Sequence, residues 1–241
     1  MPRFAAVLPF AITAFLASTP AVAQPAGPAV PGPYVFDIRA SMTGLPKSGG
    51  FYPVLPVGTL VPRRGFGLDV GGHVYPGSLG RARLGIGVDV VRVRGTASTP
   101  AVATSTSMST TPSGTPTSSS AQGSALSSAS RIDVRSTITV VAPQISFSFG
   151  TREGWSYLSA GYGTALMRSV ASGRTSGPVV AGATIERDSG RLAAVNYGGG
   201  ARWFIRAHLA VGFDLRFHRL ASAGDRPAST LVMASAGVSV R

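Results

Sequence analysis

The chain lacks cysteine, has a single lysine (Lys47) and carries few acidic residues. The absence of cysteine excludes disulfides, thiolate metal sites and a lipid anchor on an N-terminal cysteine. Beyond the N-terminal region, no apolar run reaches the roughly 18 residues that a transmembrane helix needs. Because an open sheet edge would leave backbone groups unpaired in lipid, only a closed β-barrel could take this chain across a bilayer.

The N-terminus has the layout of an export signal. Met1 to Arg3 give a positive start, residues 4–16 are apolar, and Ala21 to Ala23 offer a small-residue cleavage site. This layout predicts a cleaved secretory signal peptide over residues 1–23, rather than a helix kept in the mature protein. The proline-rich residues 24–33 are predicted to form a stiff periplasmic leader, and residues 34–241 a single domain.

Alternation of apolar and polar residues is clearest in residues 207–219, A-H-L-A-V-G-F-D-L-R-F-H-R. It predicts a strand with one apolar face and one polar face. The run is long enough for a tilted membrane crossing, which takes about 9–11 residues. With this segment, the predicted strands are residues 34–42, 64–75, 81–94, 132–149, 155–170, 192–205, 207–219 and 230–240.

The apolar phase slips twice along these strands. The slip near Val91 predicts either a β-bulge or the point where the strand leaves the membrane. The slip at Pro143 predicts a bulge, since proline cannot donate to the ladder.

The connections between the strands alternate short and long. Short ones fall at residues 76–80, at 150–154 and around Arg206, and long ones at residues 43–63, 95–131, 172–191 and 221–229. This rhythm predicts an all-β fold, an eight-stranded antiparallel up-and-down transmembrane barrel with both termini in the periplasm. A soluble β-sandwich is the alternative, and it would have shorter strands.

The longest connection, residues 95–131, has low complexity. Residues 95–130 contain no charge, and 20 of the 36 are Ser or Thr. Such a segment buries too little apolar surface to offset its ordering entropy, so a disordered outer loop is predicted. It is either a displayed surface loop or a tolerated insertion without a role.

Charged residues recur on the polar faces of the predicted strands. An eight-stranded barrel is just wide enough for side chains to fill it, and buried charges must be paired. We therefore expect Arg–Asp bridges in the interior, either as a structural plug or as the gate of a narrow pore. The residues are Asp37, Arg39, Asp69, Arg83, Asp89, Arg202, Asp214 and Arg216.

Most of the other arginines fall in the predicted outer loops or at outer strand ends. The net charge is +13, and guanidinium groups suit bidentate contacts with phosphate. We interpret these residues as contacts to outer-membrane lipid and lipopolysaccharide, with solvated surface charge as the alternative and no nucleic acid as partner. The residues chosen are Arg63, Arg64, Arg92, Arg94 and Arg131. Aromatic residues predict a girdle at the opposite, periplasmic rim: Tyr34, Phe36, Tyr75, Phe147, Phe149, Trp155, Tyr157 and Trp203.

Catalytic motifs are weak in this chain. Its histidines, His73, His208 and His218, have no serine two positions later, the spacing that lipid A deacylase barrels use. No Ser–His–acid arrangement and no clustered metal ligands emerge. We therefore expect a non-catalytic protein without cofactor or metal.

Residues 198–217 form a glycine-rich hairpin that resembles one in the eight-stranded outer-membrane barrel superfamily, which includes the OmpA transmembrane domain and OmpW-like proteins. The matching residues are Gly198 to Gly200, Asp214 and Arg216. The resemblance implies a monomeric barrel in a Gram-negative-type outer membrane. Members of the family usually end on Phe or Trp, which is part of the signal read by the barrel-assembly machinery. The resemblance therefore implies this machinery as a partner. This chain departs from the pattern, since it ends in Val240 and Arg241. No peptidoglycan-binding domain is expected.

The function expected from these features is structural or surface-interactive: envelope integrity, adhesion or display of the long loop. A narrow porin-like channel for small or apolar solutes is the alternative.

Overall fold

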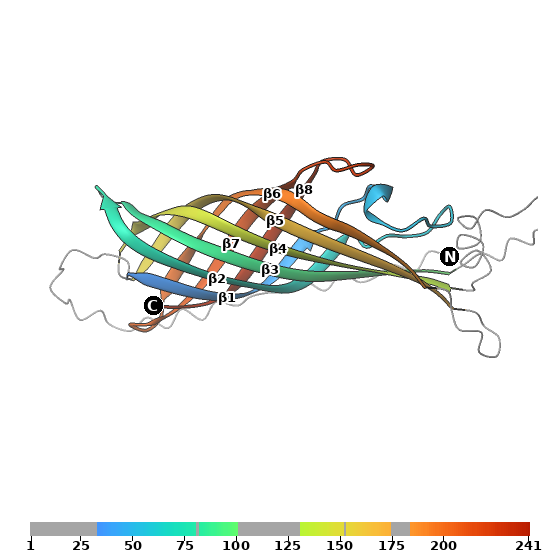
Figure 1. Cartoon of the computed structure of the whole chain (residues 1–241). Coiled ribbons are helices and arrows are strands. Elements are labelled where there is room, and N and C mark those ends of the chain that lie inside the picture. The colour runs from blue at the N-terminus through green and yellow to red at the C-terminus, as the bar shows by residue number, and fades with distance from the viewer. Residues whose placement is uncertain (1–32, 81, 101–130, 152, 175–183) are drawn as a thin grey trace, which may run out of the picture.

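The eight strands of the chain form one closed antiparallel barrel in the order β1 to β8, with β8 pairing back onto β1 (Figure 1). The computed structural model describes residues 33–80, 82–100, 131–151, 153–174 and 184–241. The strands are β1 (Tyr34–Gly44), β2 (Arg64–Leu79), β3 (Ala82–Pro100), β4 (Arg131–Gly150), β5 (Gly154–Arg174), β6 (Thr184–Phe204), β7 (Leu209–Leu220) and β8 (Ser229–Val240). A short 3-10 helix, η1 (Gly49–Phe51), lies in the β1–β2 loop. The predicted fold class is confirmed, while the predicted signal peptide lies outside the described residues.

In the part of the chain that the structure describes, no helix is long and apolar enough to cross a membrane.

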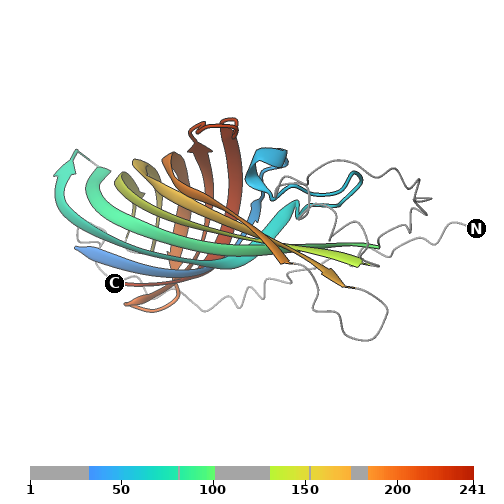
Figure 2. The same cartoon turned by 45° about the vertical axis from the view of Figure 1, so that its right-hand side comes forward.

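Strand length differs strongly around the barrel. Strands β3 to β6 have 19 to 21 residues, whereas β1, β7 and β8 have 11 or 12. Beyond the ends of the short strands, β3 to β6 continue as a four-stranded sheet (Figures 1 and 2). This sheet lies at the end with the long connections, which is the outer end of such barrels.

Two predicted loops are therefore shorter than the sequence suggested. Residues 95–100 belong to β3, Arg131 belongs to β4, and the β5–β6 connection shortens because both strands extend into it. The prediction was wrong there because ladder hydrogen bonds to a neighbouring strand order the polar residues that composition assigned to a loop. Residues 101–130, the rest of the predicted disordered loop, lie outside the described residues.

Both phase slips reflect a change of surroundings. Val90 faces outward and Val91 inward in a register that continues without a shift, so Val91 marks the membrane exit. Pro143 likewise lies opposite Val88 in unbroken register, and the predicted bulge there is wrong. Outward residues face lipid below this level and water above it, so the apolar side chains move from the outer face to the inner face.

Buried side chains occupy the lumen in three layers. Val35, Tyr75 and Trp155 pack near the periplasmic end, and a polar layer fills the middle. The outer layer is an apolar cluster that includes Ile138 and Met167 and extends to Phe51 and Tyr52 of the β1–β2 loop. The outer mouth is therefore closed by a folded loop.

Tyr52 fixes that loop. Its hydroxyl donates to the backbone oxygen of Pro46 at 2.7 Å, and only 2 % of the residue is exposed. Burial disfavours the phenolate and raises the pKa of Tyr52 to about 12.

The outer wall carries a belt of exposed apolar side chains, as a lipid-facing surface requires. It includes Phe36, Ile38, Met42, Phe66, Leu68, Ile86, Val88, Val90, Val141, Ile145, Phe147, Leu158, Val195, Phe213, Leu215, Val232 and Val238.

The predicted aromatic girdle is partly wrong. Tyr34, Phe36, Phe147, Phe149 and Trp203 face outward as a girdle requires. The other three predicted members, Tyr75, Trp155 and Tyr157, are only 2 % exposed and point into the lumen. They lie on the inward parity of β2 and β5, which residue type alone does not reveal.

Candidate functional site

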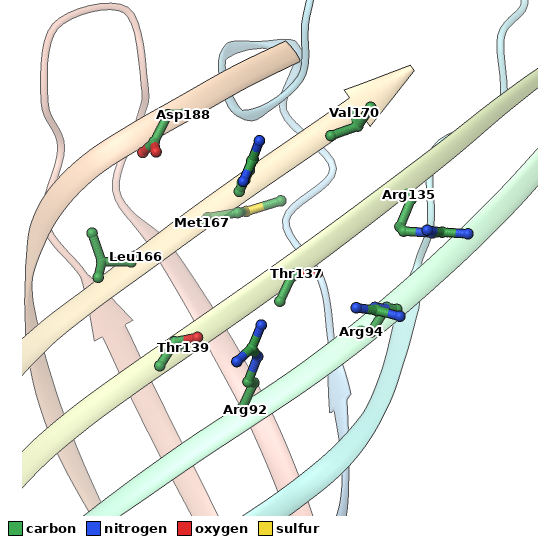
Figure 3. Close-up of a pocket in the computed structure, with 10 residues that line it drawn as sticks. Arg92, Arg94, Arg135, Thr137, Thr139, Leu166, Met167, Val170 and Asp188 are labelled. Carbon is green, nitrogen blue, oxygen red and sulfur yellow. The ribbon is translucent and has the colours of Figure 1, made fainter. Parts of the chain in front are cut away.

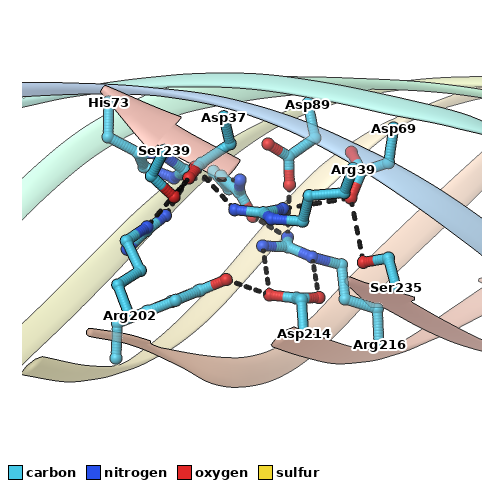
Figure 4. Close-up of polar contacts among 12 residues, drawn as sticks. Asp37, Arg39, Asp69, His73, Asp89, Arg202, Asp214, Arg216, Ser235 and Ser239 are labelled. Carbon is cyan, nitrogen blue, oxygen red and sulfur yellow. Dashed lines mark hydrogen bonds and ion pairs between the residues drawn. The ribbon is translucent and has the colours of Figure 1, made fainter. Parts of the chain in front are cut away.

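Every strand contributes to the polar middle layer of the lumen (Figure 4). The inward positions are polar because they alternate with the lipid-facing residues of the same strands. The layer is made of Asp37 and Arg39 (β1), Asp69 and His73 (β2), Asp89 (β3), Gln144 (β4), Tyr157 (β5), Arg202 (β6), Asp214 and Arg216 (β7), and Ser235 and Ser239 (β8).

Asp37 is the shared acceptor at the periplasmic side of this layer. Arg202 donates to it from Nε at 2.9 Å and from Nη2 at 2.5 Å, and Arg39 lies 2.5 Å away. The Ser239 hydroxyl donates to the same carboxylate at 2.5 Å. The Arg202 guanidinium also stacks on Tyr157, 4.0 Å from the ring centroid. Burial is therefore balanced by several charge-assisted contacts.

Arg216 is the hub on the other side. It lies 2.8 Å from Asp89 and 2.8 Å from Asp214, and it donates to the Gln144 side-chain oxygen. The Tyr157 hydroxyl also donates to Asp214. Arg39 also lies 3.0 Å from Asp69, whose carboxylate accepts a hydrogen bond from the Ser235 hydroxyl at 3.3 Å.

Glycines opposite the charged residues make room for this layer. Gly71 is the cross-strand partner of both Asp37 and Asp89, and a Cβ there would lie 2.0 Å from Asp89 Oδ1. Gly198 takes the same position opposite Arg216. The glycine content of the strands thus sets the width left for charged side chains in a narrow barrel.

The structure brings together seven of the eight interior residues chosen from the sequence. All seven are at most 2 % exposed. The eighth, Arg83, lies toward the periplasmic end of β3, half-buried, and donates to the backbone oxygen of Tyr75 at 3.3 Å. The middle layer therefore holds four carboxylates, Asp37, Asp69, Asp89 and Asp214, and three guanidinium groups, Arg39, Arg202 and Arg216.

Sequence reasoning missed Gln144 and Tyr157 as members of this layer. Both are buried and contact the hub residues. Their inward direction could have been found by taking every second residue along β4, through Pro143, and along β5, instead of following the apolar residues.

The outer wall above the apolar belt carries a second polar arrangement (Figure 3). Arg92 and Arg94 are exposed neighbours on β3, and the exposed Arg135 lies next to them on β4. With Thr137, Thr139 and Leu166 they line a surface depression of about 360 Å³. Sequence reasoning chose Arg92 and Arg94 and missed Arg135, because the assumed bulge at Pro143 hid the parity of β4.

The other arginines chosen for lipid contact lie elsewhere. Arg63 and Arg64 are exposed near Lys47 and Met42 on the β1–β2 side. Arg131 stands near the end of the protruding sheet, where it pairs with Asp133 at 3.0 Å and donates to Ser98 at 3.0 Å. The five residues therefore do not form one surface.

The histidines are far from a hydrolase arrangement. His73 and His218 are buried in the lumen, and His73 lies 3.0 Å from the Gln144 side-chain nitrogen. His208 is exposed at the periplasmic end, where its Nδ1 lies 3.1 Å from the backbone oxygen of Arg241. Over the described ranges, no group of His, Asp and Glu side chains has the arrangement of a metal site.

These features define the class of the protein. The eight strands close into a barrel with an apolar outer belt. The short turns lie at the end where β1 starts and β8 ends, and the long strands extend from the other end. This is the architecture of an outer-membrane β-barrel.

Similarity to known proteins is low. No protein-family model matches the chain, and no curated protein matches it. Among solved structures, the chain is similar to Ail, the attachment invasion locus protein of Yersinia pestis, at 13 % identity over 86 % of this chain and 97 % of that one, with a TM-score of 0.44. Neisserial surface protein A matches at 12 % identity over 87 % and 97 %, with a TM-score of 0.44. The Escherichia coli outer-membrane protease OmpT matches at 8 % identity over 74 % and 64 %, also with a TM-score of 0.44.

Proposed function

We propose that this protein is a sealed, non-catalytic outer-membrane barrel with a structural or surface-interaction role, exported through a cleaved signal peptide. It supports the envelope or presents its outer sheet and long loop to partners outside the cell. The observation that carries this proposal is the filled lumen, where a polar layer lies beneath an apolar cluster that the β1–β2 loop closes.

The ion pairs of the middle layer support a plug rather than a pathway. Arg39, Arg202 and Arg216 each contact at least one carboxylate within 3.0 Å, and all three side chains are buried. An ion crossing this layer would have to break buried pairs, at about 3–5 kcal/mol for each uncompensated charge. It would then meet the apolar cluster, where it has no polar partner.

The four-stranded outer sheet supports a surface role. Its inner face is packed by Ile132, Val134 and Ala171. Within the described residues, its two edges, residues 95–100 and 184–192, have no neighbouring strand on their outer side. Such edges offer unpaired backbone groups to an extended partner. Adhesion by this sheet is therefore part of the proposal.

The test is the conductance of the folded protein in planar bilayers. The unmodified barrel should give no steady current under conditions in which a porin, reconstituted in the same membrane, conducts. Because the lumen contains exchangeable pairs around Arg39, the alternative is a narrow gated channel. Frequent discrete conductance steps that disappear with a non-inserting preparation would establish that alternative and refute the sealed barrel.

Catalysis has a separate test. Purified protein incubated with lipopolysaccharide or phospholipid should release no fatty acid and no shortened glycolipid. Turnover that survives purification to homogeneity would contradict the non-catalytic assignment.

A further inference from the structure

The arginine patch, Arg92, Arg94 and Arg135, lies one step outside the apolar belt. Val90 and Val141 are cross-strand partners that face outward at the top of the belt. Arg92 follows Val90 by two residues on the same face, and its partner on β4 is Thr139. The patch thus lies at the depth where lipid headgroups meet the acyl region.

The strand register gathers the patch around one threonine. Thr137 lies opposite Arg94 on one side and Arg168 on the other. Arg135 precedes Thr137 by two residues on β4, and its own partners are Thr96 and Val170. Outward side chains in neighbouring positions of a sheet are about 5–8 Å apart, which several donors to one phosphate group can span.

The charges of the patch are uncompensated. All nine acidic residues of the chain lie in the described part. Asp133, two residues from Arg135 on the same face of β4, pairs with Arg131, and Glu186 is engaged by Arg168 through two contacts. Within the described ranges, Arg92, Arg94 and Arg135 form neither an ion pair nor a side-chain hydrogen bond, whereas Arg131 and Arg187 each pair with an aspartate.

Three unpaired guanidinium groups on adjacent strands repel one another, and an anion is what would hold them together. The strands also hold these side chains at fixed spacing. The neighbouring bulge, where Gly190 takes a left-handed φ of +62°, leaves Asp188 at the border of the depression, opposite Arg168.

We propose that the arginine patch binds the phosphate groups of a phosphorylated glycolipid of the outer leaflet. Arg92 and Arg94 donate to the phosphate, with Arg135 and the Thr137 hydroxyl completing the donor set. The acyl chains of the same lipid lie on Val90 and Val141, and its sugar contacts Leu166. This apolar floor favours a lipid over a soluble polyanion, which would need only the charges. The proposal rests on the membrane location and is independent of whether the lumen conducts.

The experiment uses the full mature chain folded in detergent micelles. The probe is diphosphorylated lipid A, with fully dephosphorylated lipid A as the comparison. The patch variant is Arg92→Ser/Arg94→Ser/Arg135→Ser. A control variant, Lys47→Ser/Arg206→Ser/Arg219→Ser, removes the same charge from exposed positions outside the patch.

The patch variant should bind diphosphorylated lipid A about tenfold or more weakly than the unmodified protein, given the strength of hydrogen bonds to charged groups. The control should retain most of the affinity. Dephosphorylated lipid A should not distinguish the patch variant from the unmodified protein. If the triple variant does not fold, as judged by its unboiled migration on a gel, the single Arg→Gln variants replace it.

Three outcomes would overturn the proposal. Equal loss of affinity in the patch and control variants would mean that net charge alone attracts the lipid. Full displacement of lipid A by inorganic phosphate at similar concentration would mean that the patch recognises a free anion. Patch-dependent binding of heparin without binding of lipid A would assign the patch to a soluble sulfated glycan.

Discussion

Removing one arginine from the lumen should affect stability according to how many partners its carboxylates keep. The two arginines to compare are Arg202 and Arg216, both fully buried. After Arg202→Met, Asp37 still has Arg39 at 2.5 Å and the Ser239 hydroxyl at 2.5 Å. After Arg216→Met, Asp89 loses its one ion pair among the described residues, and Asp214 keeps the Tyr157 hydroxyl.

Breaking a buried ion pair by removing one partner costs about 3–5 kcal/mol when the remaining charge is uncompensated. We therefore expect Arg202→Met to lower the free energy of unfolding by about 3 kcal/mol or less, including the lost stacking on Tyr157. Arg216→Met should reach about 5 kcal/mol, since it leaves two carboxylates. Methionine keeps much of the side-chain volume, so the difference reports charge rather than a cavity.

The assay is urea unfolding of the barrel in phospholipid vesicles, followed by the fluorescence of Trp155 and Trp203 and by the fraction that migrates fast without boiling. A repair variant, Asp89→Asn/Asp214→Asn/Arg216→Met, removes the hub and both of its charges together. It should recover most of the stability, because replacing a whole buried ion pair is often close to neutral. If Arg216→Met is no less stable than Arg202→Met, or if the repair variant recovers nothing, pairing of charges does not hold the middle layer together.

Three further predictions follow from the same structure. Gly71→Ala should destabilise the barrel by about 1–3 kcal/mol in urea unfolding, because its Cβ would lie 2.0 Å from Asp89 Oδ1. Gly72→Ala should leave urea unfolding unchanged, since the nearest neighbour of its Cβ is 4.0 Å away, and equal effects of the two variants would contradict the packing argument. Asp69→Asn should leave stability unchanged or raise it, because three carboxylates then match three guanidinium groups. Asp37→Asn should lower stability by leaving Arg202 unpaired, and the reverse order in urea unfolding would show that charge balance does not matter here. Since the pKa of Tyr52 is raised to about 12, the stability contributed by the buried neutral phenol is complete below pH 10 and is lost between about pH 10 and 12. Tyrosinate absorbance should show a late transition that Tyr52→Phe removes, and titration of Tyr52 near pH 10 would refute its burial.

The sequence by itself determined the fold class of this protein. Period-two alternation over segments such as residues 207–219, together with the short–long rhythm of the connections, was enough to predict eight antiparallel strands in a barrel. Parity also predicted which charged residues point inward, since Asp37, Arg39 and Asp214 alternate with lipid-facing side chains. These properties are local, and they depend on one strand and its two environments.

Only the tertiary structure decided what those environments are. The inward apolar residues of β4, such as Ile138, and the outward Arg135 follow from the level at which each strand leaves the lipid, and that level depends on its neighbours. The separation of Arg83 from the middle layer, and the meeting of Arg92, Arg94 and Arg135 on one surface, depend on the cross-strand register. Sequence order does not contain that register, because hydrogen bonding between strands and barrel closure fix it.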